Sequence, residues 1–284
     1  MEAALYCVAT PIGNLGDITE RAVSVLRSVD VIYAEDTRVT RKLLTHLGIQ
    51  KSLHSLHQHN EAARVEAIFS AITAGQSIAL VSDAGTPLIS DPGYYLVGAL
   101  VSQGINVIPV PGVSALITAL SAAGLPTDRF AFEGFLSAKG STRRKAMEAL
   151  KSATSTLVFY ESSHRIKDFL IDLQEIFGAQ REIVIARELT KLYEHFYRGS
   201  VSDLLTQLEG DENMRKGEFV VMVAGVGKTG EESEQTALDT ARLLEILVDE
   251  LPVKQAATIA AKLTGQAKNS LYRQAMEIKE KEDG

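Results

Sequence analysis

Short apolar runs alternate with segments of helical periodicity along the first 125 residues. The runs are rich in Val and Ile and bounded by Gly, Pro or Asp, which is typical of strands. They lie at Leu5–Thr10, Val31–Glu35, Ser77–Val81 and Asn106–Val110. The intervening pattern predicts helices at Thr19–Ser28, Thr37–Leu47, Glu61–Ala74 and Tyr94–Gln103, with C-cap glycines at Gly48, Gly75 and Gly104. This order indicates an α/β fold with a largely parallel sheet covered on both faces.

A second unit of the same kind follows, from about Arg129 to Val226. Its predicted strands are Phe130–Glu133, Thr156–Tyr160, Ile183–Arg187, His195–Arg198 and Phe219–Ala224, and its predicted helices are Thr142–Lys151, Ile166–Phe177 and Val201–Leu208. Gly-Leu-Pro within Ala123–Asp128 stops the preceding helix and marks the joint between the units. We therefore expect α/β lobes at residues 1–125 and 126–227.

The end of the chain has a different pattern. The polar, Gly-rich stretch Gly227–Gln235 predicts a flexible linker. Beyond it, apolar residues at helical spacing predict three helices within 236–284, and the turn Leu263-Thr264-Gly265 has helix-turn-helix character. This small domain carries Lys254, Lys262, Lys268 and Arg273 but no acid between Pro252 and Met276. It is either a helical cap with a solvated basic face or a module that contacts RNA.

Composition narrows the class of protein. Apolar residues make up 45% and charged residues 23% of the chain, and the net charge is −7, so a polyanion would have to meet a local basic patch. The single cysteine, Cys7, excludes an internal disulfide and a multi-thiolate metal site, and we expect no metal. The N-terminus lacks a basic signal-peptide region, and the apolar stretch Val113–Leu125 is shorter than the roughly 20 residues that span a bilayer. We therefore expect a cytoplasmic protein without a membrane partner.

Six polar or Gly- and Pro-containing loops follow predicted strands. They are Thr10–Asp17, Glu35–Arg38, Ser82–Pro87, Pro111–Ala115, Tyr160–Arg165 and Arg187–Lys191. Ligands of open α/β sheets bind beyond the carboxyl ends of strands, so these loops predict one cleft between the two lobes. Gly13, Gly85 and Gly112 would let the backbone approach a nucleoside-bearing ligand closely.

Simpler sites fit the sequence less well. Gly13-Asn14-Leu15-Gly16 is not the G-x-G-x-x-G dinucleotide fingerprint. Gly112-Val113-Ser114 imitates a nucleophile elbow, but Leu116 stands where the second glycine would be. The cluster His54, His57 and His59 lacks metal-ligand spacing and a nearby carboxylate motif, so a polar or RNA-facing surface is the better interpretation.

The loop motifs VATPIGNLGDIT, AEDTR, VSDAGTPLISDPG, PVPGVSA, FYESSHR and ARELTK stand in this order along the chain. Together they resemble the ribosomal RNA small subunit methyltransferase I family, a branch of the tetrapyrrole methylase superfamily. The resemblance implies two unequal α/β lobes, S-adenosylmethionine between them, a helical extension and a homodimer. It also implies 2′-O-methylation of a decoding-region cytidine of 16S rRNA in the assembled small ribosomal subunit.

The resemblance also implies site residues. The implied cofactor contacts are Pro11, Ile12, Gly13, Asp83, Ala84, Gly85, Thr86, Val113, Ser114, Ala115, Tyr160, Leu189 and Ala224. The first loop departs from the superfamily pattern G-x-G-x-G-D, with Thr10-Pro11-Ile12 in place of the first glycines. This departure argues against tetrapyrrole methylation and agrees with the RNA-modifying branch.

A ribose hydroxyl must lose its proton to attack a methyl group, and charged residues near the predicted cleft are candidates for this step. They are Asp36, Glu188 and Lys191, although Arg187–Lys191 is alternatively an ion-pair network between the lobes. Arginine and lysine suit phosphate, and the candidates for RNA contact are Arg38, Arg41, Lys42, Arg143, Arg144, Arg165, Lys254, Lys262, Lys268 and Arg273.

Three functions fit these features of the sequence. The first is an RNA ribose methyltransferase, the second a small-molecule C-methylase of the same fold, and the third a non-enzymatic RNA-binding assembly factor. A tetrapyrrole does not require the basic stretches Arg38–Lys51 and Lys139–Lys151 or the C-terminal helices. An assembly factor does not require six loops that converge on a nucleoside cleft. The sequence therefore favours the first function.

Overall fold

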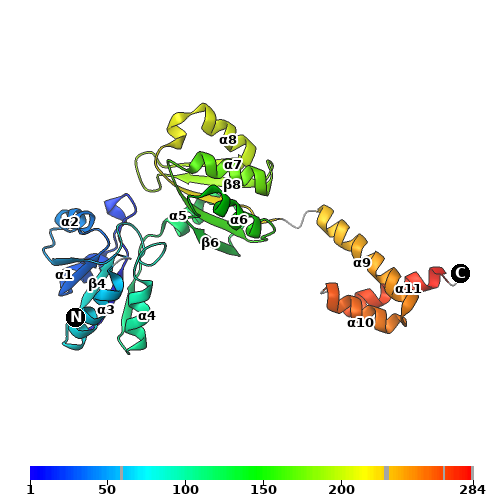
Figure 1. Ribbon diagram of the computed structural model, residues 1–284, viewed down its shortest axis with the longest axis horizontal. Coiled ribbons are helices and arrows are strands. Elements are labelled where there is room, and N and C mark those ends of the chain that lie inside the picture. The colour runs from blue at the N-terminus through cyan, green and yellow to red at the C-terminus, as the bar shows by residue number, and fades with distance from the viewer. Residues whose placement is uncertain (58–59, 227–229, 265, 283–284) are drawn as a thin grey trace. The chain divides into compact units, whose positions relative to one another are not determined.

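The computed structural model describes residues 1–57, 60–226, 230–264 and 266–282, and it divides into two compact units, 1–225 and 226–284 (Figure 1). His59, the start of the predicted linker at 227–229, and Gly265 of the predicted turn lie outside the described residues. Within the described part, no helix is both long enough and apolar enough to cross a membrane.

The first sheet has five strands, all parallel, in the order β3-β2-β4-β1-β5. The strands are β1 (Leu5–Val8), β2 (Val31–Ala34), β3 (Ser52–Ser55), β4 (Ile78–Val81) and β5 (Val107–Val110). The helices between them are α1 (Glu20–Ser28), α2 (Thr37–His46), α3 (Glu61–Thr73) and α4 (Tyr94–Ser102), with a 3-10 turn at Leu15–Asp17. The predicted parallel sheet is confirmed, and Gly48, Gly75 and Gly104 all have the left-handed φ of C-caps.

Helices cover both faces of this sheet, as the apolar pattern predicted. Leu26 of α1 and Leu44 of α2 pack with Val8 on one face. Ile68 of α3 and Leu100 of α4 pack with Leu80 on the other. The edge strand β3 has no apolar run because its sequence is Ser-Leu-His-Ser and no residue in it is buried, which is why the hydrophobic pattern did not predict it.

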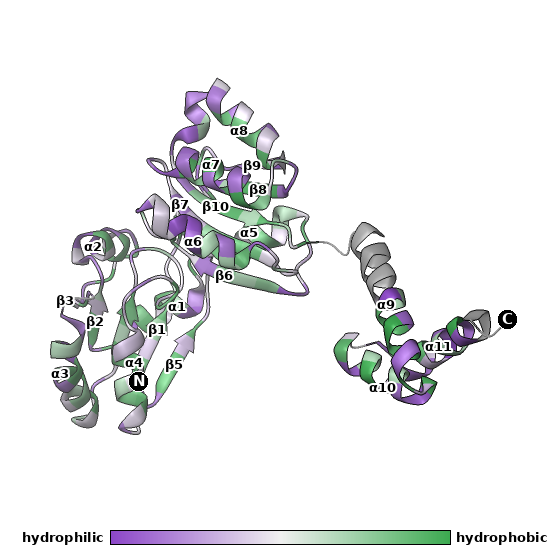
Figure 2. Cartoon of the chain, turned by 45° about the vertical axis from the view of Figure 1, so that its right-hand side comes forward, coloured by the Kyte–Doolittle hydropathy of each residue, from purple (hydrophilic) through white to green (hydrophobic). Residues whose placement is uncertain are grey.

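The second sheet, whose five strands are labelled in Figure 2, has the order β6-β7-β10-β8-β9, and only β6 runs parallel to its neighbour. Its strands are β6 (Phe130–Gly134), β7 (Thr156–Ser162), β8 (Glu182–Arg187), β9 (His195–Ser200) and β10 (Glu218–Val223). Its helices are α6 (Gly140–Leu150), α7 (Ile166–Phe177) and α8 (Val201–Gly210), and a 3-10 helix spans Glu212–Arg215. Phe169 of α7 and Leu204 of α8 pack with Phe159 of β7 on one face.

Helix α5 (Ala115–Ala123) covers the opposite face of the second sheet. Leu116 and Leu120 pack there with Val184, and Gly124, with φ of +80°, ends the helix within the predicted joint. The sequence pattern assigned this helix to the first lobe, yet its apolar side belongs to the core of the second. A sheet needs cover on both faces, and the three following helices occupy only one of them.

The C-terminal unit consists of α9 (Gly230–Glu250), α10 (Val253–Thr264) and α11 (Lys268–Glu282). Leu244, Ala256, Ala260 and Leu271 form its core, where alanine lets the helices approach closely. Leu263, which has core spacing in the sequence, is 69% exposed instead. The predicted linker is wrong from Gly230 onwards, because residues 230–235 already belong to α9.

Arg143 has a structural position that corrects its assignment to RNA contact. Its guanidinium donates to Asp172 on α7, with Nε and Oδ2 2.6 Å apart, and both side chains are only 5% exposed. The neighbouring Arg144 is half-exposed and pairs with the other oxygen of Asp172 at 3.1 Å. A charge taken out of water is stable only when it is paired, so this ion pair joins α6 to α7.

We expect Asp172→Asn to lower the free energy of unfolding by about 3 kcal/mol, because it leaves the buried Arg143 charge without its counterion. Urea unfolding followed by circular dichroism measures the change. The matched control is Asp168→Asn, an exposed position on the same helix. Equal unfolding midpoints for the two variants would contradict the structural role of this pair.

Candidate functional site

A cavity of about 390 Å³ lies where the predicted loops meet, and each of the six loops contributes to its wall. This convergence follows from strand direction. The carboxyl ends of β1, β2, β4 and β5 share one edge of the first sheet because these strands are parallel. In the second sheet β7 and β8 both run opposite to β10, so their carboxyl ends lie beside its start at Glu218.

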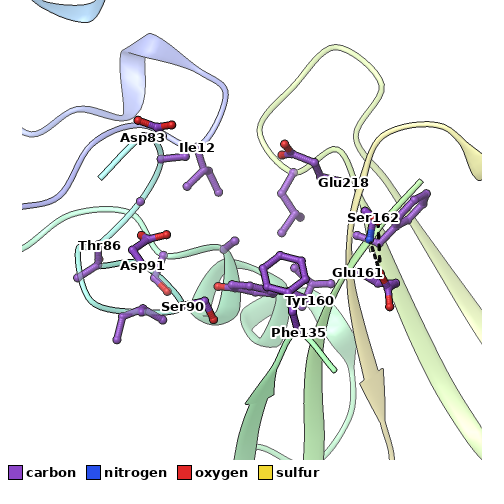
Figure 3. A pocket seen from close by; sticks show the side chains of 18 of the residues that line it. Ile12, Asp83, Thr86, Ser90, Asp91, Phe135, Tyr160, Glu161, Ser162 and Glu218 are labelled. Atoms are coloured by element: carbon purple, nitrogen blue, oxygen red, sulfur yellow. Dashed lines mark hydrogen bonds between the residues drawn. The ribbon is translucent and has the colours of Figure 1, made fainter. Parts of the chain in front are cut away.

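Most of the residues that the resemblance implied for the cofactor line this cavity (Figure 3). They are Ile12, Asp83, Ala84, Gly85, Thr86, Ser114, Ala115, Tyr160 and Leu189. Of these, Figure 3 labels Ile12, Asp83, Thr86 and Tyr160. Pro11, Gly13 and Val113 belong to the same loops but lie outside the cavity wall. Ala224 follows the other end of β10, away from Glu218, because that strand is antiparallel to its neighbours.

Gly85 is the glycine that opens the cavity. Its φ is +82°, and it exchanges two backbone hydrogen bonds with Thr10. A Cβ at this position would lie 3.3 Å from Cγ2 of Ile12 and 3.6 Å from the carbonyl oxygen of Val113. The other two predicted glycines allow protein contacts instead: a Cβ on Gly13 would overlap Lys191, and one on Gly112 would overlap Ala9.

Polar contacts hold the loops around the cavity to one another. The N–H of Asn14 in the first lobe donates to Oγ1 of Thr190 in the second at 3.1 Å. The N–H of Leu116, in the first turn of α5, donates to the Tyr160 hydroxyl at 3.0 Å. These bonds set the spacing of the walls and fix the orientation of the Tyr160 ring.

Backbone strain is concentrated beside the cavity. In the described part of the chain, the non-glycine residues with positive φ are Leu88, Ser90, Glu188 and Thr190. The first two lie in the loop that follows β4, and the other two in the loop that follows β8. Such conformations cost of order 1–3 kcal/mol each and persist where the surrounding contacts hold them, often at functional sites.

Three carboxylates, Glu35, Asp83 and Asp91, belong to the wall that the first lobe forms. Figure 3 labels Asp83 and Asp91. Burial is the largest cause that raises the pKa of each. Repulsion from a neighbouring carboxylate adds to the rise, from Asp36 in the case of Asp83. The pKa of Asp91 rises to about 6. The sequence reasoning did not select Glu35 or Asp91; the available signal for Asp91 was an acid followed by Pro-Gly in a strand-end loop.

Asp36, one of the predicted catalytic residues, lies beside the cavity but outside its wall. Its side chain caps α2, accepts from the N–H of Arg38 at 2.8 Å and forms an ion pair with the same residue at 2.6 Å. The hydrogen bonds from Arg38 lower the pKa of Asp36 to about 2. Its backbone N–H donates to Asp83 at 2.9 Å, which joins two of the loops.

Glu188 and Lys191, the other two candidates, also lie outside the cavity wall and form a network with Glu218. Nζ of Lys191 lies 2.9 Å from a carboxylate oxygen of each acid. Burial alone would raise the pKa of Glu188 and lower that of Lys191, but their mutual hydrogen bonding outweighs it in both cases. The pKa of Glu188 is therefore lowered and that of Lys191 raised, so Lys191 remains an ammonium and does not accept a proton at neutral pH.

The predicted RNA-contacting residues differ in exposure. Arg41 and Lys42 are exposed on α2, together with Arg38, whose side chain is 87% exposed despite its ion pair. Arg165 is mostly buried and bonds to Glu161 and to the carbonyl of Leu136. The remaining four are all exposed on the C-terminal unit: Lys254, Lys262, Lys268 and Arg273.

The cavity fits S-adenosylmethionine in size and charge. Its volume lies within the usual range for small-molecule sites. The missing Cβ of Gly85 leaves backbone exposed to a ligand, and the apolar side chains of Ile12 and Leu189 face the same space. Carboxylates on the wall suit a ligand that carries a sulfonium and an ammonium group.

Comparisons with known proteins agree with this site. A family model described as Tetrapyrrole (Corrin/Porphyrin) Methylases matches residues 4–205, and one described as RsmI C-terminal HTH domain matches residues 234–279. The chain is 51% identical to the ribosomal RNA small subunit methyltransferase I of Escherichia coli O157:H7, over 97% of this chain and 96% of that protein. It is 45% identical to the protein of the same name from Mesorhizobium japonicum, over 99% and 94%.

Solved structures share the fold at low sequence identity. Diphthine synthase aligns with a TM-score of 0.60 at 15% identity, over 78% of this chain and 89% of that one. A uroporphyrin-III C-methyltransferase from Thermus thermophilus, complexed with S-adenosyl homocysteine, aligns with a TM-score of 0.54 at 18% identity, over 78% and 97%.

These matches confirm what the loop motifs indicated: the tetrapyrrole methylase fold with C-terminal helices, and methyltransferase activity that uses S-adenosylmethionine. The second of the two family models matches the stretch for which the sequence predicted three helices. With one family model covering most of its length and relatives about half identical to it from end to end, the chain belongs to the tetrapyrrole methylases and, within them, to the ribosomal RNA small subunit methyltransferase I family.

Proposed function

We propose that this protein transfers the methyl group of S-adenosylmethionine to the 2′-oxygen of a decoding-region cytidine in 16S rRNA, within the assembled small ribosomal subunit. The observation that carries the proposal is the similarity of the whole chain, C-terminal unit included, to enzymes named ribosomal RNA small subunit methyltransferase I. The solved tetrapyrrole-methylase structures cover about four-fifths of this chain, so the fold alone does not distinguish RNA from a tetrapyrrole as the acceptor.

The cofactor would lie in the cavity against Gly85 and the start of α5, with Ile12 and Leu189 beside it. S-adenosylmethionine supplies a methyl group on a sulfonium, which is open to in-line attack by an oxygen nucleophile. The protein would position the two reactants. Its loops are fixed to one another by the hydrogen bonds between Asn14 and Thr190 and between Leu116 and Tyr160. Holding two reactants in line removes several kcal/mol of barrier.

The chain has a net charge of −7, so its overall charge does not attract RNA. Exposed local groups of cations would bind the phosphates of the acceptor RNA instead. Arg38, Arg41 and Lys42 lie on α2, directly after the loop that contributes Glu35 to the cavity. The basic residues of the C-terminal unit form a second group. Phosphate contacts of this kind position an RNA and carry no sequence information directly.

A homodimer in the cytoplasm completes the proposal. Exposed apolar side chains on α4 support an interface between two copies, since Tyr94 is 82% exposed and Tyr95 and Val101 lie on the same short helix. Light scattering of the purified protein measures the oligomeric state directly.

Gly85→Val should weaken S-adenosylmethionine binding by roughly tenfold or more, measured by isothermal titration. The branched side chain enters the space between Ile12 and the Val113 carbonyl. The control is Gly104→Val, because Gly104 has a similar φ of +79° but no described atom within 4 Å of the added Cβ. The prediction fails if both variants bind the cofactor as the wild type does.

The acceptor atom should be the ribose 2′-oxygen. A methylated 2′-oxygen cannot attack its own phosphate, so alkaline hydrolysis of the modified 16S rRNA should leave one uncleaved linkage after a cytidine. The control is the same RNA from cells that lack the gene. Complete cleavage at the modified nucleotide would show a base methylase instead.

Replacing Lys254, Lys262, Lys268 and Arg273 together by Gln should weaken binding to small subunits and leave cofactor affinity unchanged. Log K falls as log salt rises, and each lost phosphate contact should make this negative slope shallower by about one unit. The control is Lys167→Gln on the first unit, where the ammonium pairs with Glu209. If subunit affinity and salt slope both stay at wild-type values, the C-terminal helices serve only as a cap.

A further inference from the structure

One part of the cavity wall is not accounted for by the cofactor residues. It consists of Ser90 and Asp91, from the loop that follows β4, and Phe135, which follows β6. In Figure 3 Ser90 and Asp91 come from the first lobe, while Phe135 lies beside Tyr160 of the second sheet. The two pieces are in contact, because a Cβ on Gly134 would lie 3.2 Å from Oγ of Ser90.

Phe135 is an exposed aromatic side chain held in a fixed group of rings. It is 57% exposed although it lines the cavity. Its ring centroid lies 5.5 Å from that of Tyr160 at 65°, and Tyr160 contacts Phe132 in the same edge-to-face manner at 4.8 Å. Since the Leu116 N–H fixes the Tyr160 hydroxyl, Phe135 presents an exposed surface with a supported orientation. Proteins that recognise unpaired nucleotides stack bases on such side chains.

Asp91 lines the same cavity as Phe135 and lies in a stretch of constrained backbone. Ser90 before it has φ of +66°, and Gly93 two residues later has φ of +126°. Among the described residues, no lysine, arginine or histidine forms an ion pair with Asp91. Its carboxylate therefore differs from those of Asp36 and Glu188, which form ion pairs with Arg38 and Lys191.

We propose that Asp91 and Phe135 form the subsite for the acceptor nucleoside, in which Phe135 stacks on the cytosine and Asp91 receives the proton of the ribose 2′-hydroxyl. This inference rests on the proposed function and names residues for it. The new bond joins O2′ to the methyl carbon, and the bond from that carbon to sulfur breaks. Its electron pair stays on sulfur, which becomes a neutral thioether, and the O2′ proton passes to the carboxylate.

The charges that face Asp91 set the pH at which it can act. Glu35 from the loop after β2 and Asp83 from the loop after β4 repel its charge, and the Tyr160 hydroxyl lies nearby on β7. Burial is the larger cause, and together they raise the pKa of Asp91 to about 6. A base acts when it is deprotonated, so the methylation rate should rise with pH through about 6 and level off above it.

Asp91→Asn should reduce the single-turnover methylation rate by about 10²- to 10⁴-fold, the usual contribution of a general base. Cofactor affinity by isothermal titration and subunit affinity by filter binding should change less than about threefold. Asp91→Glu keeps the carboxylate and should restore part of the rate, with a shifted pH midpoint. The matched control is Asp128→Asn, which is exposed and lies outside the cavity wall.

Phe135→Ala should raise the KM for small subunits by about tenfold to a hundredfold, because one stacked base is lost. Cofactor affinity should stay unchanged, and Phe135→Tyr should restore most of the KM. The control is Phe130→Ala, since Phe130 is also an exposed aromatic residue of β6 but does not line the cavity.

The outcomes separate this subsite from the function on which it rests. If the wild-type protein leaves no alkali-resistant linkage, the proposed function fails. If the wild type does so while Asp91→Asn keeps its rate and pH profile, the subsite is wrong. It is also wrong if either variant loses cofactor affinity in proportion to its activity, because those residues then hold the cofactor. If the Asp91→Asn protein does not fold, the Asp91→Glu variant provides the test. The subsite is then wrong if the pH profile of Asp91→Glu equals that of the wild type.

Discussion

The direction of the strands is the constraint on which the site depends. Four parallel strands of the first sheet place their following loops at one edge, and β7 and β8 do the same in the second sheet because both oppose β10. Reversing any of these strands would carry its loop to the far edge, about 13 Å away for the four-residue strands of the first sheet. Ala224 shows this effect, since it follows the strand that runs the other way.

The fold and most of the cavity could be predicted because both depend on local patterns. Apolar runs identified nine of the ten strands, and strand-end loops identified the walls. The predictions that failed concerned contacts between residues that are far apart in the sequence. Nothing local in the sequence indicates that Arg143 meets Asp172 on another helix, or that α5 covers the second sheet rather than the first. Leu263 has the spacing of a core residue, but the core of the C-terminal unit contains the alanines of α10 and not Leu263.

Burial divides the acids of this protein into two kinds. Asp36 and Glu188 have cationic partners and are held ionised, so they fix loops in place. Glu35, Asp83 and Asp91 face the cavity, where burial and repulsion from neighbouring carboxylates make their charged forms less stable. Among these three, Asp91 has its pKa raised to about 6, and perturbed pKa values of this kind gather at functional sites. The same negative wall attracts a cationic cofactor, while phosphates need the exposed cations of α2 and of the C-terminal unit.

The strained residues explain why the two lobes need each other. Ser90 and Thr190 hold left-handed conformations that an isolated loop would relax. Each has a contact across the lobe junction: Ser90 packs on Gly134, and Thr190 accepts the Asn14 N–H. Packing between the lobes therefore offsets strain within the loops, and the side chains next to the strained residues are held in place before a ligand arrives. A site ordered in this way loses less conformational entropy on binding than one assembled from relaxed loops.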